Sequence, residues 1–105
     1  MIFLGIESSS DIASVAIVDE DKVLGVHTIN RGRNHSVLLA PMVEALLKDT
    51  GLSLRDLDGI GVDVGPGSFT GIRIGIALGT ALAYGANLPC LGVSSLAALQ
   101  YAGEK

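Results

Sequence analysis

The sequence predicts an α/β domain with a five-stranded mixed sheet and helices on both faces. Three apolar, β-rich segments follow one another near the start and are separated by short polar turns, which indicates an antiparallel meander. Two later apolar segments each follow a helix-length amphipathic segment, which is typical of parallel strands joined by helices. Of the 105 residues, 49% are apolar, so a single domain can build its own core.

The meander occupies the first thirty residues. We expect the first strand over Ile2 to Glu7 and the second over Ile12 to Val18, with a turn at Ser8 to Asp11 between them. The charged run Asp19 to Asp21 predicts a hairpin tip, and the third strand follows over Lys22 to Ile29. His27 falls on this third strand, where the sequence indicates no partner for it.

A polar loop then leads into the first helix. Asn34 or Ser36 can cap a helix that runs to about Thr50, and Gly51 is a suitable residue to end it. Pro41 removes one backbone donor, so we expect a weak first turn or a slight kink near it.

The rest of the chain alternates between strands and helices. We expect a strand over residues 58–64, a sharp glycine-rich turn over 65–68 and a helix over 68–84. A short strand over 89–93 and a third helix over 94–101 follow. The resulting order βββαβαβα is the ribonuclease-H-like arrangement, which is also one half of an actin-like ATPase.

Charge and cysteine content narrow the functional class. The net charge is −4, and the only basic cluster is Arg31, Arg33 and His35, so strong RNA binding by this chain alone is not expected. The single Cys90 lies in an apolar run, which favours a packing role in a reducing compartment. The sequence shows no signal peptide, and we expect a cytoplasmic protein.

One uncharged stretch, Ile74 to Leu91, approaches the length of a membrane span. Gly85, Asn87 and Pro89 interrupt it, so we interpret it as a helix followed by a strand.

Both long helices are rich in apolar residues. On a helical wheel the first helix shows an apolar arc of about 220°, twice what docking on a sheet needs. The excess predicts a partner surface that includes Leu38, Leu39, Met42 and Leu46.

In the second helix, the spacing of Gly71, Gly75 and Gly79 predicts a close approach to the sheet and to the first helix. The opposite side is small and mildly polar. We interpret it as a second part of the partner surface, because of the wide apolar arc of the first helix; the alternative is an ordinary solvent face. This side carries Thr70, Arg73, Ala77, Thr80, Ala81 and Tyr84.

Two turns could hold a phosphate group. The first contains Glu7, Ser8 and Ser9 with the nearby Asp11, and the second contains Gly65, Gly67 and Ser68. Glycines before a helix leave backbone donors open to an anion, but simple chain reversal is the favoured interpretation of both turns. A P-loop lysine, a Ser-His-Asp set and metal-ligand spacing are all missing, so we expect no catalytic residue, no metal and no cofactor.

The string Gly65-Pro-Gly-Ser-Phe-Thr-Gly-Ile-Arg-Ile-Gly75 resembles the TsaB (YeaZ) family. Gly5-Ile-Glu-Ser-Ser9, the His35-Ser36 pair and Gly92-Val-Ser-Ser-Leu96 extend the resemblance over nearly the whole chain. Residues 1–105 would then be the family's N-terminal domain, with its second domain absent. One departure is Glu7, where many members have Asp.

The resemblance implies a non-catalytic scaffold for TsaD, the enzyme that makes threonylcarbamoyladenosine at position 37 of tRNA. TsaD carries a metal-binding histidine pair, and Ser95 and Leu99 occupy those positions here. The implied partners are TsaD and the ATPase TsaE, with self-pairing when alone and tRNA contact only through the complex. The alternative is half of an actin-like nucleotide-binding or phosphotransfer enzyme.

Overall fold

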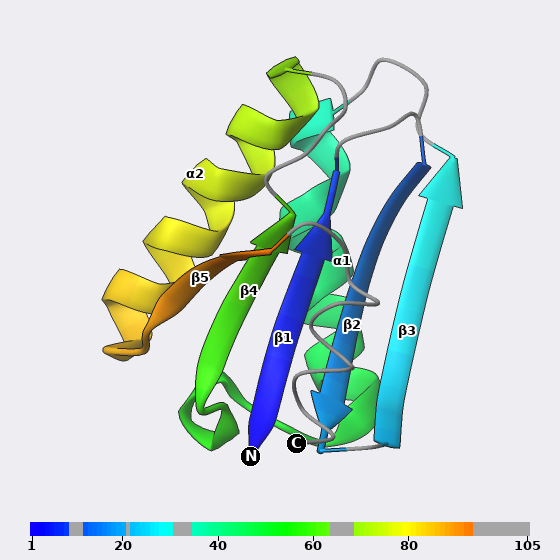
Figure 1. The fold of residues 1–105 in the computed structure, drawn as a ribbon. Coiled ribbons are helices and arrows are strands. Elements are labelled where there is room, and N and C mark those ends of the chain that lie inside the picture. Colours follow the sequence, from blue (N-terminus) through cyan, green and yellow to red (C-terminus); the bar gives the residue numbers. More distant parts are fainter. Residues whose placement is uncertain (9–11, 21, 31–34, 64–68, 94–105) are drawn as a thin grey trace.

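The computed structural model describes residues 1–8, 12–20, 22–30, 35–63 and 69–93 (Figure 1). Its elements follow the predicted order, with one short addition. They are β1 (Ile2–Glu7), β2 (Ile12–Asp19), β3 (Lys22–Asn30), α1 (His35–Thr50), the 3-10 helix η1 (Leu54–Asp56), β4 (Gly59–Asp63), α2 (Phe69–Ala86) and β5 (Cys90–Val93).

The five strands form one mixed sheet in the order β3-β2-β1-β4-β5. β1 pairs antiparallel with β2 and β2 with β3, whereas β4 runs parallel to both β1 and β5. The predicted meander and parallel strands are therefore confirmed. The tight β2–β3 connection imposes the antiparallel pairing, and the helical crossover through α2 allows the parallel one.

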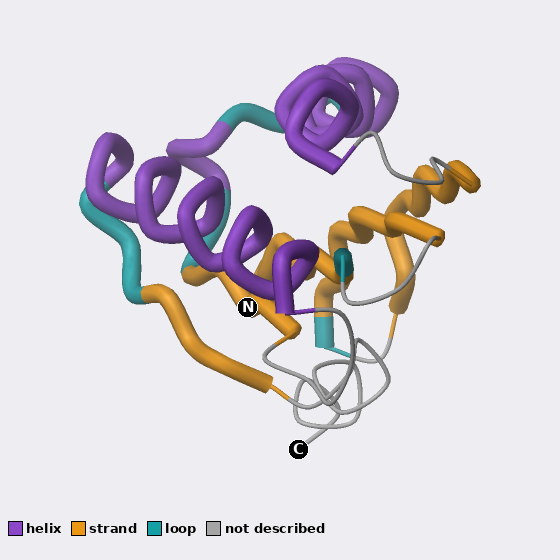
Figure 2. Tube along the Cα trace, turned by 90° about the horizontal axis from the view of Figure 1, so that it is seen from above, coloured by secondary structure: helices purple, strands orange, loops and turns teal. Residues whose placement is uncertain are grey.

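The two long helices, α1 and α2, cover the same face of the sheet, as Figure 2 shows from above. Side chains from α1 and α2 share one core cluster with β1, β2 and β4. The third predicted helix, over residues 94–101, lies outside the described residues. The expectation of a helix on the second face thus remains a prediction.

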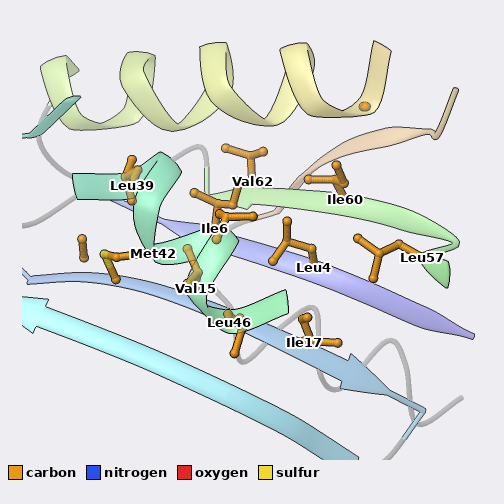
Figure 3. Packing of buried hydrophobic residues seen from close by; sticks show 13 residues of the cluster. Leu4, Ile6, Val15, Ile17, Leu39, Met42, Leu46, Leu57, Ile60 and Val62 are labelled. Carbon is orange, nitrogen blue, oxygen red and sulfur yellow. The ribbon is translucent and has the colours of Figure 1, made fainter. Parts of the chain in front are cut away.

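The core lies between this face and the helices (Figure 3). Alternation along β1, β2 and β4 sends every second side chain toward the helices. The helices supply the remaining members except Leu57, which follows η1. The buried cluster consists of Leu4, Ile6, Ala13, Val15, Ile17, Leu39, Met42, Val43, Leu46, Leu57, Ile60, Val62 and Ala83.

Each long helix ends in a left-handed residue. Gly51 has φ 73°, and the Leu52 amide donates to the Leu47 carbonyl at 3.0 Å, which closes the last turn of α1 as predicted. Asn87 has φ 58° and ends α2 in the same way, with the Leu88 amide 2.8 Å from the Ala83 carbonyl. α1 continues through Pro41.

The glycines of α2 bring it close to the sheet. A Cβ at Gly75 would lie 2.5 Å from Ser8 Oγ, and one at Gly79 would lie 2.4 Å from Val62 Cγ2. The predicted close approach to the sheet is confirmed at these two positions, but none of the nearest atoms belongs to α1, so the predicted approach to the first helix is not seen there. The surroundings of Gly71 lie outside the described part. Among the described helices, none is long and apolar enough to cross a membrane.

Candidate functional site

The outer side of α2 is an exposed stripe of small and mildly polar residues. Arg73, Ala77, Thr80 and Tyr84 recur at intervals of three or four positions and are all exposed. Tyr84 has 90% of its surface open to solvent, which is unusual for an aromatic side chain. We call these four residues the α2 stripe. The side chain of Thr70, also predicted here, lies outside the described residues.

The predicted contribution of α1 to the partner surface needs correction. Leu39 and Leu46 are each 1% exposed and Met42 is 8% exposed, so all three belong to the chain's own core. The wheel overestimated the free apolar surface because the sheet covers one part of the arc and α2 covers another. We therefore remove these three residues from the candidate surface; the side chain of Leu38 lies outside the described residues.

A cleft of about 290 Å³ separates the two helices. Its walls are almost entirely apolar. The charged residue among them is Glu44, which is exposed to solvent on α1. The lining residues are Ala40, Val43, Glu44, Leu47, Leu54, Leu78 and Leu82. The cleft is the part of the apolar arc of α1 that neither the sheet nor α2 fills.

A second candidate region lies where β1 and β4 end. Ile6 pairs with Val62 in the parallel register, so Glu7 and Asp63 follow side by side at the same edge of the sheet. Asp63 is 3% exposed. Partial burial raises the pKa of the Glu7 carboxyl, and the nearby charge of Asp63 raises it further.

The predicted phosphate turns are only partly described. Ser8 follows Glu7 and is buried beneath α2, where its hydroxyl lies against Gly75. Ser9, Asp11, Gly65, Gly67 and Ser68 lie outside the described residues. The phosphate-loop hypothesis therefore stays a prediction.

Neither Asp63 nor the cleft was among the features predicted from the sequence. An acid that closes a glycine- and valine-rich strand was the available signal for Asp63, because a buried strand rarely ends on an unsupported carboxylate. The cleft depends on how far apart α1 and α2 lie, and the sequence of either helix alone does not indicate that distance.

The structure also shows the surroundings of three other titratable residues, His27, Asp49 and Cys90. His27 Nε2 lies 2.8 Å from Asp49 Oδ2, a hydrogen bond between β3 and the last turn of α1 that the sequence did not indicate. Cys90 is exposed, so its predicted packing role is wrong, because β5 forms the edge of the sheet. Within the described ranges, no three His, Cys, Asp or Glu side chains form a group that could hold a metal.

Comparison with known proteins places this chain in a family. The family model described as TsaD, tRNA N6-adenosine threonylcarbamoyltransferase, matches residues 11–105. The chain belongs to the TsaD family. The chain is also similar to the curated TsaB proteins of Bacillus subtilis and Escherichia coli, which are named tRNA threonylcarbamoyladenosine biosynthesis proteins and are 39% and 41% identical over 104 and 96 residues.

Members named as the enzyme are similar too. The tRNA N6-adenosine threonylcarbamoyltransferase of Cereibacter sphaeroides is 39% identical over 116 aligned positions, covering 92% of this chain and 32% of the enzyme. The two TsaB relatives are covered to 45% and 41%, and the matches take in 99% and 91% of this chain. The chain thus spans less than half the length of the curated relatives it matches.

The fold agrees with the family. YeaZ from Pseudomonas aeruginosa superposes with a TM-score of 0.83 at 38% identity, over 91% of this chain and 45% of that structure. The resemblance to the TsaB (YeaZ) family drawn from the glycine-rich string is confirmed.

Proposed function

We propose that this chain is a non-catalytic partner domain that supports a TsaD enzyme in threonylcarbamoylation of adenosine 37 of tRNA. The observation that carries the proposal is the exposed α2 stripe beside an apolar cleft, on a chain similar to proteins named for threonylcarbamoyladenosine biosynthesis. The proposed partners are TsaD and TsaE in the cytoplasm, with a homodimer when the chain is alone and tRNA reached through the complex.

The surface has the character of a helix-binding site. Ala77 and Thr80 are small and leave the stripe flat, and Tyr84 is an aromatic of the kind that dominates interface energies. The adjacent cleft offers apolar walls that a partner helix could cover. The proposed interface therefore comprises the α2 stripe and the cleft, in place of the three core residues of α1.

The non-catalytic assignment rests on residue chemistry. By resemblance, the metal-binding histidines of TsaD correspond to Ser95 and Leu99, which do not supply an imidazole. The net charge of −4 also favours tRNA contact through a partner subunit.

The test is complex formation with purified TsaD, measured by light scattering and calorimetry. We expect a one-to-one complex that Ala77→Glu weakens at least tenfold, because a bulky charged side chain would be buried in a contact that small residues keep flat. Ala77 is exposed, so the variant should fold normally, which circular dichroism checks. Lys48→Gln is the matched control, because Lys48 is exposed on α1 and does not line the cleft.

An absence of any complex with TsaD, together with normal folding, would contradict the proposal. So would threonylcarbamoylation by this chain alone. Met42→Glu is unsuitable as a probe, because Met42 lies in the core and a buried charge there would unfold the domain.

The alternative function, half of an actin-like nucleotide-binding enzyme, is favoured by one feature. Glu7 and Asp63 lie at the carboxyl ends of adjacent parallel strands, the edge at which open α/β sheets bind ligands. Calorimetry with magnesium and ATP tests it. Micromolar binding that Glu7→Ala abolishes would favour this alternative, and no binding at millimolar ATP would remove it.

A further inference from the structure

β3 is the last strand of the sheet, and its outer edge pairs with no other described strand. It runs for nine residues, longer than the usual strand. An open edge presents a row of unpaired backbone donors and acceptors, and proteins usually protect it with charges, proline or a bulge. The protection on β3 is confined to one end, where Lys22 begins the strand and the register with β2 shifts at Val18.

The rest of β3 is apolar and exposed. Four of the nine large apolar side chains that are exposed in the described part of the chain belong to it, with 37–52% of their surface open: Val23, Leu24, Val26 and Ile29. His27, the remaining ionisable residue of the strand, is hydrogen-bonded by Asp49 of α1. Nothing between Lys22 and Asn30 therefore carries a free charge toward the edge.

Two of these residues lie beside β2 residues that are themselves buried, with Val18 4% and Ala16 6% exposed. Val23 and Val26 pair with Val18 and Ala16 of β2, on the face opposite the helices. A strand added beside β3 would cover their flanks and satisfy the open backbone groups.

The charges that flank β3 have opposite signs at its two ends. Three acids stand at the start of β3: Asp19 and Glu20, where β2 turns into β3, and Asp21, which follows in the sequence. Two cations partly balance them, Lys22 and the Met1 ammonium, which lies 3.3 Å from Asp19 Oδ1. This end therefore has a net charge of about −1. Beyond the other end, the sequence continues with Arg31 and Arg33. An antiparallel arrangement of two identical strands would bring the acidic end of each beside the basic end of the other.

We propose that β3 is a self-association surface, on which β3 of a second copy of this chain pairs antiparallel. The occupant is a second copy because the strand is complementary to itself in both apolar content and flanking charge. This contact is separate from the α2 stripe. A chain that pairs through both surfaces would form assemblies larger than a dimer, since each surface binds a different second copy.

The test uses the whole chain with the helical surface disabled by Ala77→Glu. We expect this variant still to self-associate with rising concentration in sedimentation velocity, and added salt to weaken the association. Adding Val26→Lys should weaken it at least tenfold, because a charge on the edge opposes strand pairing. Adding Val26→Thr should leave it nearly unchanged, since threonine keeps the β-branched shape.

Val26 is half exposed, so neither substitution should disturb the fold, which thermal unfolding checks. A strictly monomeric Ala77→Glu variant at all concentrations would overturn the proposal. Association that persists equally in Ala77→Glu/Val26→Lys would overturn it too. TsaD binding is measured in a separate experiment. A negative result for β3 self-association would therefore leave the proposed function standing, and a negative result for TsaD binding would leave the β3 proposal standing.

Discussion

At the scale of single residues, the two buried glycines of α2 fix how closely the helix approaches the sheet. Gly79→Ala would place a methyl group 2.4 Å from Val62 Cγ2 and 3.6 Å from Cys90 Sγ. We expect a loss of about 1–3 kcal/mol in the free energy of unfolding, even though alanine favours helix by about 1 kcal/mol. Urea unfolding measures it.

Gly85 provides the matched control for this prediction. It lies in the last turn of the same helix, and a Cβ there would meet nothing within 4 Å. Gly85→Ala should therefore stabilise the domain by about 0.5–1 kcal/mol. Equal effects at the two positions would show that α2 does not lie as close to Val62 as described.

Glu7 makes a second residue-scale prediction, on pH. Burial and Asp63 raise the pKa of Glu7 in the folded chain above its ordinary value of 4.5. The folded state therefore holds this proton more tightly than the unfolded state, and the stabilisation is full below pH 4.5 and is lost as pH rises through the folded pKa. Glu7→Gln should thus stabilise the domain at pH 7 and have little effect at pH 3.

The gain should stay below about 1 kcal/mol, because Glu7 is only partly buried and water screens its charge. Chemical unfolding of both proteins across this pH range measures the difference. Glu44→Gln, at an exposed position on α1, is the comparison variant. A Glu7→Gln effect that is the same at pH 3 and pH 7 would contradict the pKa argument.

At the scale of elements, strands and helices were largely predictable because their signals are local. Alternation, turn residues and the Gly51 terminator fixed the first three strands and α1 to within a few residues. η1 was missed because it is a single turn. It depends on a short-range cap in which the Ser53 amide donates to Asp56 Oδ2 at 2.8 Å.

The candidate site was predictable only in part. The exposed stripe could be read from α2 alone, since the glycines identify the side of the helix that faces the sheet. The apolar residues of α1 were correctly identified, but which of them remain free depends on α2 and on the sheet. The pairing of Glu7 with Asp63 likewise depends on a parallel register between strands that are more than fifty residues apart.

The division of α1 and α2 into core and surface gives the third prediction. Leu46→Ala should cost about 2–5 kcal/mol in the free energy of unfolding, because Leu46 is fully buried in the core cluster. Tyr84→Ala should change it by less than about 0.5 kcal/mol, since Tyr84 is 90% exposed. Urea unfolding distinguishes the two, and a large loss in Tyr84→Ala would show that Tyr84 packs within the domain.

At the scale of the whole molecule, stability and partner binding should be linked through α2. One side of this helix packs on β1 and β4, and the other side carries the stripe proposed to bind TsaD. A partner that binds only the folded chain stabilises it by mass action, by about 2.7 kcal/mol at a hundredfold excess over Kd. The melting temperature of this chain should therefore rise when TsaD is added.

The same linkage distinguishes the effect of a substitution in the α2 stripe from that of a substitution in the core. Ala77→Glu should leave the melting temperature of the isolated chain unchanged and abolish the rise with TsaD, because Ala77 is exposed until a partner covers it. Leu46→Ala should lower the starting temperature and keep the rise, because its side chain stabilises the fold without reaching the partner. Scanning calorimetry of both variants with and without TsaD measures these shifts. A rise that survives in Ala77→Glu would mean that TsaD binds elsewhere on the domain.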